Sequence, residues 1–292
     1  MADDGSIHLP IPRPDIRIAL ALGGGGARGL SHILVLEAFD ELGVRPTEMA
    51  GTSIGALIGA AYASGLSGAA IRDHVLSLLT DRRELARKVL QTRSGKFMQF
   101  FQSGLNGSVM VDPVRLLAQL LPSGVALDFA DLDIPFTAVA TDFWSRSEAR
   151  MSEGPLITAI AASIAIPSVL KPVLRDGRVL VDGGAVNPLP FDVFDDKVEI
   201  CVAVDVTGGP VRSDKAKHPA PGPFEAIFGT LQILMTSVVN EKLKARQPDI
   251  LIRPDVDQFK VLDFLKAPTI LKAAEPIKDE MKRRLERILA AA

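Results

Sequence analysis

The chain has little cysteine, tryptophan, tyrosine or histidine, and its positive and negative charges almost cancel. Its 292 residues include one cysteine, one tryptophan, one tyrosine and four histidines, and the formal net charge is -2. A single cysteine, Cys201, excludes an intramolecular disulfide and suits a reducing compartment. Because Cys201 lies in an apolar run, we expect it in the core. The near-neutral charge gives no overall attraction to nucleic acid, so we expect no nucleic-acid partner.

Signals for export or for a membrane span are also weak. Residues 1–15 are polar and acidic and lack the basic start and apolar centre of a signal peptide, so we expect a cytoplasmic protein. Residues 49–71 carry no charged side chain and are long enough to cross a bilayer. They are rich in glycine, alanine and serine, however, and they contain a turn motif. We therefore expect a buried strand, turn and helix there.

Apolar runs that alternate with helical patterns predict an α/β fold with a mostly parallel sheet. Short apolar runs indicate strands, and apolar residues spaced by three and four indicate helices. The expected strands are residues 16–22, 48–50, 136–141, 179–181, 199–206 and 250–252. The expected helices are residues 29–42, 54–64, 66–80, 114–121, 156–164 and 224–244.

Three further segments have distinct patterns. Asp176-Gly177 lies between two apolar arms and predicts a hairpin. The serine- and proline-containing segment Thr207 to Pro223 predicts an exposed loop. Near the C-terminus, Ile277, Met281, Leu285 and Ile288 form an apolar stripe, which predicts a helix docked on the domain.

A glycine-rich loop follows the first expected strand: Gly23-Gly24-Gly25-Gly26-Ala27-Arg28-Gly29. Consecutive glycines allow several backbone N–H groups to converge on one oxygen at a helix N-terminus, and Arg28 adds positive charge. The spacing of Gly24, Gly26 and Gly29 also fits a dinucleotide-binding loop. That alternative requires a longer second strand than the short apolar stretch before Glu48.

A second motif, Gly51-Thr52-Ser53-Ile54-Gly55, matches the G-x-S-x-G nucleophile elbow of serine hydrolases. Gly51 and Gly55 allow the chain to turn sharply and bring backbone close to the hydroxyl of Ser53. The expected helix begins next to this hydroxyl, so its positive end can stabilise a developing anion. Ser53 is therefore the candidate nucleophile for acyl transfer.

A nucleophilic serine needs a base, and Asp182 is one candidate. It ends an expected strand and is followed by Gly183 and Gly184. A carboxylate held against Ser53 in a partly dry site has a raised pKa and can accept the hydroxyl proton directly. An isolated Asp-Gly, in contrast, is usually only a turn.

Histidine is the alternative base. His218 follows Ser53 and either Asp182 or Asp205 in the chain order of an α/β-hydrolase triad, but it lies in a proline-rich polar loop. The other histidines are weaker candidates. His8 is in the polar tail, His32 in a helix expected to lead away from the glycine loop, and His74 on another expected helix.

Together these motifs resemble those of the patatin-like phospholipase family, from about Ile16 to Val206. The resemblance includes the glycine loop, the Ser53 elbow, the Asp182 turn, Leu30-Ser31-His32, Ala162-Ser163-Ile164-Ala165-Ile166-Pro167 and Asn187-Pro188-Leu189-Pro190. It implies a three-layer α/β/α sandwich with a mostly parallel central sheet. Residues 16–206 are then expected to form the catalytic domain, and residues 207–292 a mostly helical extension packed on it.

The resemblance also implies the chemistry. Ser53 corresponds to the nucleophile and Asp182 to the proton acceptor of a dyad without histidine. The reaction implied is hydrolysis of the carboxylic ester of a phospholipid or related acyl lipid, through an acyl-serine intermediate. The oxyanion hole corresponds to Gly24, Gly25 and Gly26 with Arg28 beside them, and the other motif positions are Gly29, Gly51, Gly55, Gly183 and Gly184.

No cofactor or metal is expected, since the sequence has neither an EF-hand loop nor zinc-ligand spacing. The residues leave two other functions open: a histidine-dependent esterase or thioesterase, and a non-catalytic adaptor that keeps the fold. The segment Arg82 to Phe101 is basic and ends in aromatic residues. It suits peripheral contact with an anionic membrane, although a solvated helix followed by a core-facing one fits slightly better.

Overall fold

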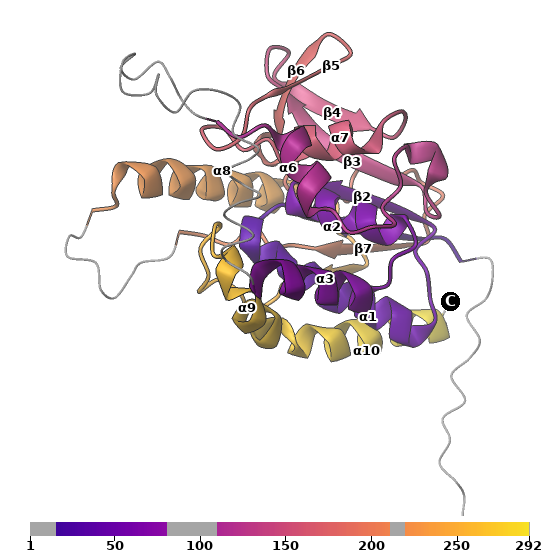
Figure 1. The fold of residues 1–292 in the computed structure, drawn as a ribbon. Coiled ribbons are helices and arrows are strands. Elements are labelled where there is room, and N and C mark those ends of the chain that lie inside the picture. The colour runs from indigo at the N-terminus through magenta and orange to yellow at the C-terminus, as the bar shows by residue number, and fades with distance from the viewer. Residues whose placement is uncertain (1–15, 81–109, 211–219, 292) are drawn as a thin grey trace, which may run out of the picture.

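One mixed sheet organises the protein (Figure 1), of which the computed structural model describes residues 16–80, 110–210 and 220–291. The strands are β1 (Ile18–Leu22), β2 (Glu48–Thr52), β3 (Phe136–Asp142), β4 (Ser147–Met151), β5 (Val173–Arg175), β6 (Arg178–Asp182), β7 (Ile200–Val204) and β8 (Ile250–Ile252). Their order is β5-β6-β3-β2-β1-β7-β8, and β4 pairs with β3 outside this path. The neighbouring strands β3, β2, β1, β7 and β8 pair in parallel. At the other side of the sheet, β4 and β6 pair antiparallel with β3, and β5 pairs antiparallel with β6.

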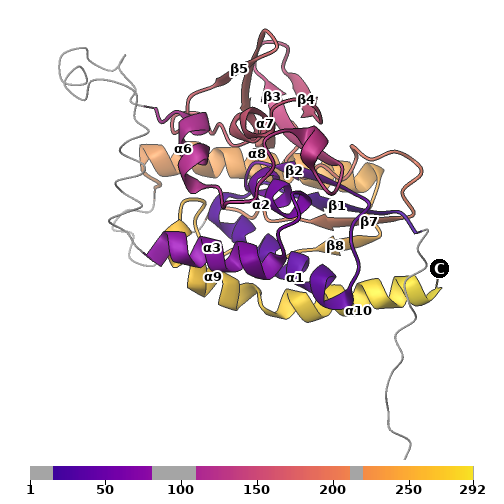
Figure 2. The ribbon, with the colours of Figure 1, turned by 45° about the vertical axis from the view of Figure 1, so that its right-hand side comes forward.

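Helices lie on both faces of this sheet. They are α1 (His32–Leu42), α2 (Ile54–Ala63), α3 (Gly68–Thr80), α6 (Pro113–Leu120), α7 (Leu156–Ser163), α8 (Pro223–Ala245), α9 (Ala267–Ala274) and α10 (Pro276–Ala291). Short 3-10 turns precede two of them, η1 (Gly26–Ser31) before α1 and η5 (Phe264–Lys266) before α9. Figures 1 and 2 show α1, α3 and α10 lying together on one side of the sheet, and α8 crossing apart from them.

The sequence of β1 shows how the two faces differ. Successive side chains of a strand point to opposite faces. The large residues Ile18, Leu20 and Leu22 therefore face the main core, which contains α1, α2 and α10. The small residues Ala19 and Ala21 face a second, smaller core with Phe191 and with Val239 of α8. Small side chains on that face leave room for α8 and the segment around Phe191 to approach the sheet closely.

The expected α/β fold with a mostly parallel sheet is confirmed, and most expected elements are present within a few residues. Residues 49–71 form a strand, a turn and two helices, as predicted. None of the helices in the described ranges is both long enough and apolar enough to span a bilayer. The sequence did not predict β4 or α9. The hairpin at Asp176-Gly177 forms, with both turn residues at positive φ (50° and 73°).

Residues after Val206 complete both faces of the sheet. They add β8 beside β7, place α8 over the small-residue face, and send α9 and α10 to the other side. The prediction of an exposed loop at 207–223 is wrong at Thr207, because this residue is buried and hydrogen-bonded to Asp205. The division into a catalytic domain at 16–206 and a C-terminal extension at 207–292 packed on it stays a prediction.

The C-terminal helix α10 docks through the apolar stripe that the sequence predicted. Ile277, Met281 and Leu285 are buried against the main core, where α10 packs on α1. An ion-pair network reinforces the contact, because Glu37 of α1 lies 2.6 Å from Arg72 and 3.0 Å from Lys278. The helix is therefore an integral part of the fold.

Truncation of the α10 stripe is expected to destabilise the protein. Met281 is fully buried, so Met281→Ala leaves a cavity and should lower the free energy of unfolding by about 2–5 kcal/mol. The exposed neighbour Arg283 provides the control, and Arg283→Ala should change it by less than about 0.5 kcal/mol. Urea denaturation measures both. Equal stability of the two variants would contradict the docked position of α10.

Candidate functional site

Ser53 occupies a strained turn between β2 and α2. Its backbone has φ 55° and ψ -122°, a combination that costs on the order of 1–3 kcal/mol for a residue other than glycine. Two hydrogen bonds fix this conformation. The Ser53 N–H donates to Ser163 Oγ at 2.9 Å, and the Ser163 hydroxyl donates to the carbonyl of Val139 at 2.6 Å. Strand β3 and helix α7 therefore hold the elbow in place.

The glycine two residues after Ser53 is required by packing. A Cβ at Gly55 would lie 2.1 Å from the carbonyl oxygen of Leu22, well inside van der Waals contact. Only glycine lets α2 pass this close to the end of β1. The motif glycine at position 55 thus sets the distance between the Ser53 turn and the glycine loop that follows Leu22.

Asp182 lies at the end of β6 and meets Ser53 directly. The Ser53 hydroxyl donates to Asp182 Oδ2 at 2.6 Å, and the N–H of Gly184 donates to Asp182 Oδ1 at 2.8 Å. The backbone of Asp182 is held as well, since its N–H donates to the Ala165 carbonyl and its carbonyl accepts from Thr141 Oγ1. Both carboxylate oxygens therefore have defined partners, and one of these is the candidate nucleophile.

Burial sets the protonation behaviour of this carboxyl group. Removal from water raises the pKa of Asp182 to about 6, and the hydrogen bonds from Ser53 and Gly184 offset part of that rise. At neutral pH the group is an anion that still binds a proton more readily than an exposed aspartate does. A base with a pKa near the working pH is suited to accept and return a proton.

Two backbone N–H groups of the glycine loop are without an acceptor among the described residues. The N–H of Gly23 donates to the Val204 carbonyl and that of Gly24 to the Pro188 carbonyl, at 3.0 and 2.8 Å. The N–H groups of Gly25 and Gly26 have no hydrogen-bond acceptor among the described residues, and both glycines line the pocket at Ser53. Of the three expected oxyanion donors, Gly24 is thus already engaged, while Gly25 and Gly26 are available.

His32 does not lead away from the glycine loop as expected; it binds back to it. Its Nε2 lies 2.8 Å from the carbonyl oxygen of Gly23, so Nε2 carries the proton and donates. Complete burial lowers the pKa of His32 to about 4, which keeps the ring neutral. His74 bonds to the Leu120 carbonyl. His8, His218 and the segment Arg82 to Phe101 lie outside the described residues.

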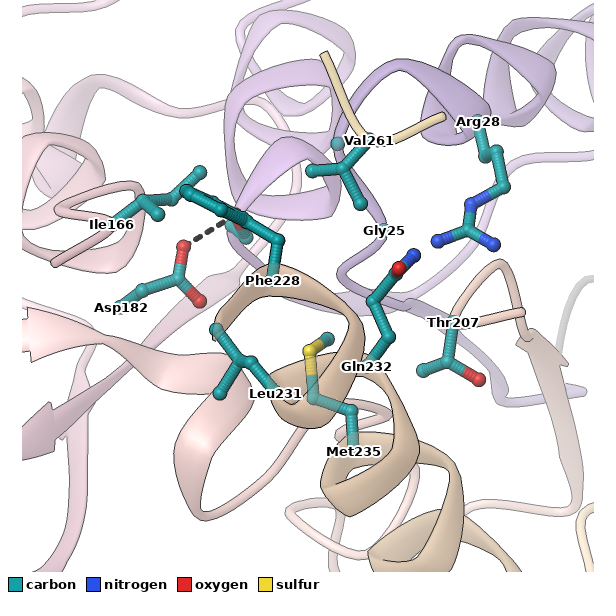
Figure 3. A pocket seen from close by; sticks show the side chains of 12 residues that line it. Gly25, Arg28, Ile166, Asp182, Thr207, Phe228, Leu231, Gln232, Met235 and Val261 are labelled. Atoms are coloured by element: carbon teal, nitrogen blue, oxygen red, sulfur yellow. Dashed lines mark hydrogen bonds between the residues drawn. The ribbon is translucent and has the colours of Figure 1, made fainter. Parts of the chain in front are cut away.

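A narrow pocket connects these groups (Figure 3). Its cavity volume is about 30 Å³. Helix α8 forms one wall of the pocket, and Figure 3 shows its side chains beside Asp182 at one end and near Arg28 at the other. The lining residues are Gly25, Gly26, Arg28, Ser53, Ile166, Asp182, Thr207, Phe228, Leu231, Gln232, Met235 and Val261.

Several of these residues could not be chosen from the sequence. The helix around residues 224–244 was expected, but nothing in its composition indicated which side would face Ser53. Thr207 was assigned to an exposed loop. Ser163 belongs to a motif of the resemblance, yet its bonds to Ser53 and Val139 depend on contacts between distant segments. In the described ranges, no group of three or more His, Cys, Asp or Glu side chains is placed to hold a metal ion.

Comparison with known proteins assigns the chain to a family. A patatin-like phospholipase model matches residues 20–195. A protein of Mycobacterium tuberculosis described as an uncharacterized NTE family protein is 38% identical over 200 residues, 67% of this chain and 51% of that protein. Human patatin-like phospholipase domain-containing protein 6 is 30% identical over 274 residues, 85% of this chain and 19% of that protein.

The chain thus spans about half of the mycobacterial relative and less of the human one. The crystal structure of VipD from Legionella pneumophila aligns with 92% of this chain and 66% of VipD, at 12% identity and a TM-score of 0.47. The family model covers more than half of the chain and includes the Ser53 elbow and the Asp182 turn. The chain therefore belongs to the patatin-like phospholipase family.

Proposed function

We propose that this protein hydrolyses carboxylic ester bonds of phospholipids or related acyl lipids, with Ser53 as nucleophile and Asp182 as general base. The observation that carries the proposal is the 2.6 Å hydrogen bond from Ser53 Oγ to Asp182 Oδ2 inside a buried site. A serine hydroxyl is a weak nucleophile unless a base removes its proton. Here the base touches the hydroxyl without an intervening histidine.

Acylation begins when Ser53 Oγ attacks the carbonyl carbon of the ester and its proton passes to Asp182 Oδ2. The carbonyl oxygen then bears the negative charge of a tetrahedral intermediate. The free N–H groups of Gly25 and Gly26 are the proposed donors to this oxygen, and the N-terminus of α2 adds a favourable dipole. Collapse of the intermediate breaks the ester C–O bond, and the departing alkoxide takes the proton from Asp182.

Deacylation repeats these reaction steps with water in place of the Ser53 hydroxyl. Asp182 takes a proton from a water molecule, whose oxygen attacks the acyl-serine carbonyl carbon. Collapse of the second intermediate breaks the bond to Ser53 Oγ, which recovers the proton from Asp182. The fatty acid leaves and the enzyme returns to its starting state. Each step moves one proton, and the raised pKa of Asp182 allows that carboxyl group to hold it.

The pocket lining supports an apolar substrate. Ile166, Leu231, Met235 and Val261 surround the space beside Ser53 and offer no charge to an acyl chain. The two alternatives to a Ser–Asp dyad make different predictions. A histidine-dependent esterase requires His218, and a non-catalytic adaptor requires neither Ser53 nor Asp182 to be reactive.

Substitution of Ser53 is expected to abolish ester hydrolysis and labelling. Wild-type protein should gain the mass of one fluorophosphonate adduct, whereas Ser53→Ala should gain none and should hydrolyse lysophospholipid at least about 10³-fold more slowly. His218→Ala should retain activity. Ser53→Gly, which tolerates the positive φ of this turn, replaces Ser53→Ala if that variant fails to fold.

The controls separate the alternatives. Loss of activity in a folded His218→Ala protein would favour a histidine-dependent enzyme. Absence of labelling and of hydrolysis in folded wild-type protein would favour the adaptor. Undiminished activity in Ser53→Ala would overturn the assignment of the nucleophile.

The pH profile should report the ionisation of Asp182. Asp182 must be an anion to accept the proton of Ser53, so kcat/KM should be constant above about pH 7 and fall about tenfold per pH unit below about pH 6. Hydrolysis of a neutral p-nitrophenyl ester between pH 4.5 and 8.5 measures it. A profile without an inflection near the pKa of Asp182, or one displaced by His218→Ala, would contradict this role.

Removal of the buried charge should stabilise the fold while it destroys activity. Because the folded state raises the pKa of Asp182, the protein loses stability as pH rises from about 4, the ordinary aspartate value, to about 6. Asp182→Asn lacks this cost, so its free energy of unfolding should exceed that of wild type by on the order of 1–3 kcal/mol near pH 8 and converge with it near pH 4.

Urea denaturation at the two pH values measures the difference. Asp176→Asn makes the same chemical change at an exposed turn and is the matched control. A destabilised Asp182→Asn protein at pH 8 would contradict the prediction.

A further inference from the structure

Asn187 connects the two turns of the proposed dyad through its backbone. Its carbonyl accepts a hydrogen bond from Thr52 Oγ1 at 2.7 Å, and Thr52 immediately precedes Ser53. Its N–H donates at 2.9 Å to the carbonyl of Gly183, which immediately follows Asp182. The position of this one residue therefore affects where both members of the dyad lie.

The residue after Asn187 fixes the glycine loop as well. The Pro188 carbonyl accepts a hydrogen bond from the N–H of Gly24 at 2.8 Å. Residues 187–189, which we call the bridging segment, thus contact both turns of the dyad and the glycine loop. A shift of this segment would move the proposed oxyanion donors relative to the candidate nucleophile.

Lys242, in the last turn of α8, holds the bridging segment in place. Its Nζ donates to Asn187 Oδ1, to the Leu189 carbonyl at 2.8 Å and to Asp192 Oδ1 at 2.6 Å. These bonds use all three donors of the ammonium group. The side chain is only 17% exposed, and its Nζ lies 5.0 Å from the centre of the Phe191 ring, which adds a cation–π contact.

The side chain of Asn187 depends on this ammonium group. Its Nδ2 donates to Glu148 Oε1 at 3.1 Å and to Asp192 Oδ1 at 3.0 Å, while its Oδ1 accepts from Lys242. Asn187 is buried, so water is a poor substitute for these partners. Loss of the ammonium would deprive the Asn187 Oδ1 and the Leu189 carbonyl of their donor, and a buried polar atom without a partner is costly. The bridging segment would then rearrange.

We propose that Lys242 is a positioning residue, which holds the bridging segment so that Ser53, Asp182 and the glycine loop keep the spacing that catalysis needs. This inference rests on the proposed function, because it concerns the same reaction. Lys242 is not part of the pocket wall, which α8 forms with residues nearer its N-terminus. Helix α8 thus contributes to the site twice, since its first half lines the pocket and its last turn sets the geometry of the reacting groups.

The test measures hydrolysis of a neutral p-nitrophenyl ester by Lys242→Met, which keeps the length of the side chain and removes its donors. A displacement of about 1 Å in an active site can lower a rate about 100-fold, so kcat should fall about 10–100-fold. Acylation and deacylation use the same oxyanion donors and should slow together, which leaves KM within about twofold.

Lys244→Met is the matched control. It makes the same substitution two residues further along α8, at a side chain that is 72% exposed, and it should change kcat and KM by less than about twofold. Lys242→Gln, which keeps a shorter neutral donor, replaces Lys242→Met if that variant fails to fold, with the same direction of change in kcat.

Active-site titration separates positioning from a purely structural role. The intact mass after exhaustive fluorophosphonate treatment counts the molecules whose Ser53 reacts. Positioning by Lys242 predicts that Lys242→Met is labelled to completion, but more slowly, and that its kcat per labelled site is reduced. A smaller labelled fraction with normal kcat per site would show a structural role only and would overturn the proposal.

A double-mutant cycle tests the route through Asn187. Asn187→Ala removes the acceptor of Lys242 but keeps the backbone groups that contact Thr52 and Gly183. Because the two side chains act through one contact, Lys242→Met combined with Asn187→Ala should lower kcat by clearly less than the product of the two single losses. Losses that multiply would show that Lys242 acts by another route and would overturn the proposal.

The remaining outcomes distinguish this proposal from the proposed function. Unchanged kcat in folded Lys242→Met, a change in KM alone, or an equal loss in Lys244→Met would overturn the positioning role while the proposed hydrolysis stands. A folded wild-type protein that neither takes the label nor cleaves the ester would count against the proposed function itself.

Discussion

The close passage of α2 over the end of β1 is the constraint on which the site depends. Gly55 allows it, because any side chain there would collide with the Leu22 carbonyl. This close packing brings the Ser53 turn beside the glycine loop. Ser163 then links the turn to β3, because its hydroxyl accepts from the Ser53 N–H and donates to the Val139 carbonyl. The candidate nucleophile, Ser53, is thus held in place by the backbone and by the buried hydroxyl of Ser163. A site held this way has little freedom to reorganise, which suits catalysis by fixed dipoles.

Much of the fold could be predicted from the sequence, because its elements have strong local patterns. The short apolar run of β1, the apolar stripe of α10 and the Asp176-Gly177 turn each indicate their structure within a few residues. Strand β4 was missed because its five residues, Ser147–Met151, are mostly polar. It pairs with β3 at the side of the sheet, where partners rather than composition decide the conformation.

The candidate site shows the same difference between features set by local sequence and features set by contacts between distant segments. Ser53 and Asp182 could be predicted as neighbours because each lies in a motif, although they are far apart in the chain; their catalytic roles stay a prediction. The bond from His32 to Gly23, the burial of Thr207 and the inward face of α8 could not be predicted. Each depends on how distant segments meet, and a helix with apolar residues on several sides gives no local sign of which side will be covered.

The lone thiol of the chain has a practical consequence. Cys201 is buried on β7, and its surroundings raise its pKa to about 12, so it carries almost no thiolate at neutral pH. The native protein is therefore expected to react very slowly with maleimide reagents. A cysteine introduced on the outer side of α8, at exposed Ile233, would be the dominant reactive position in the described part of the molecule. A fluorophore or spin label placed there could follow the pocket wall as a ligand binds, without removal of the native cysteine.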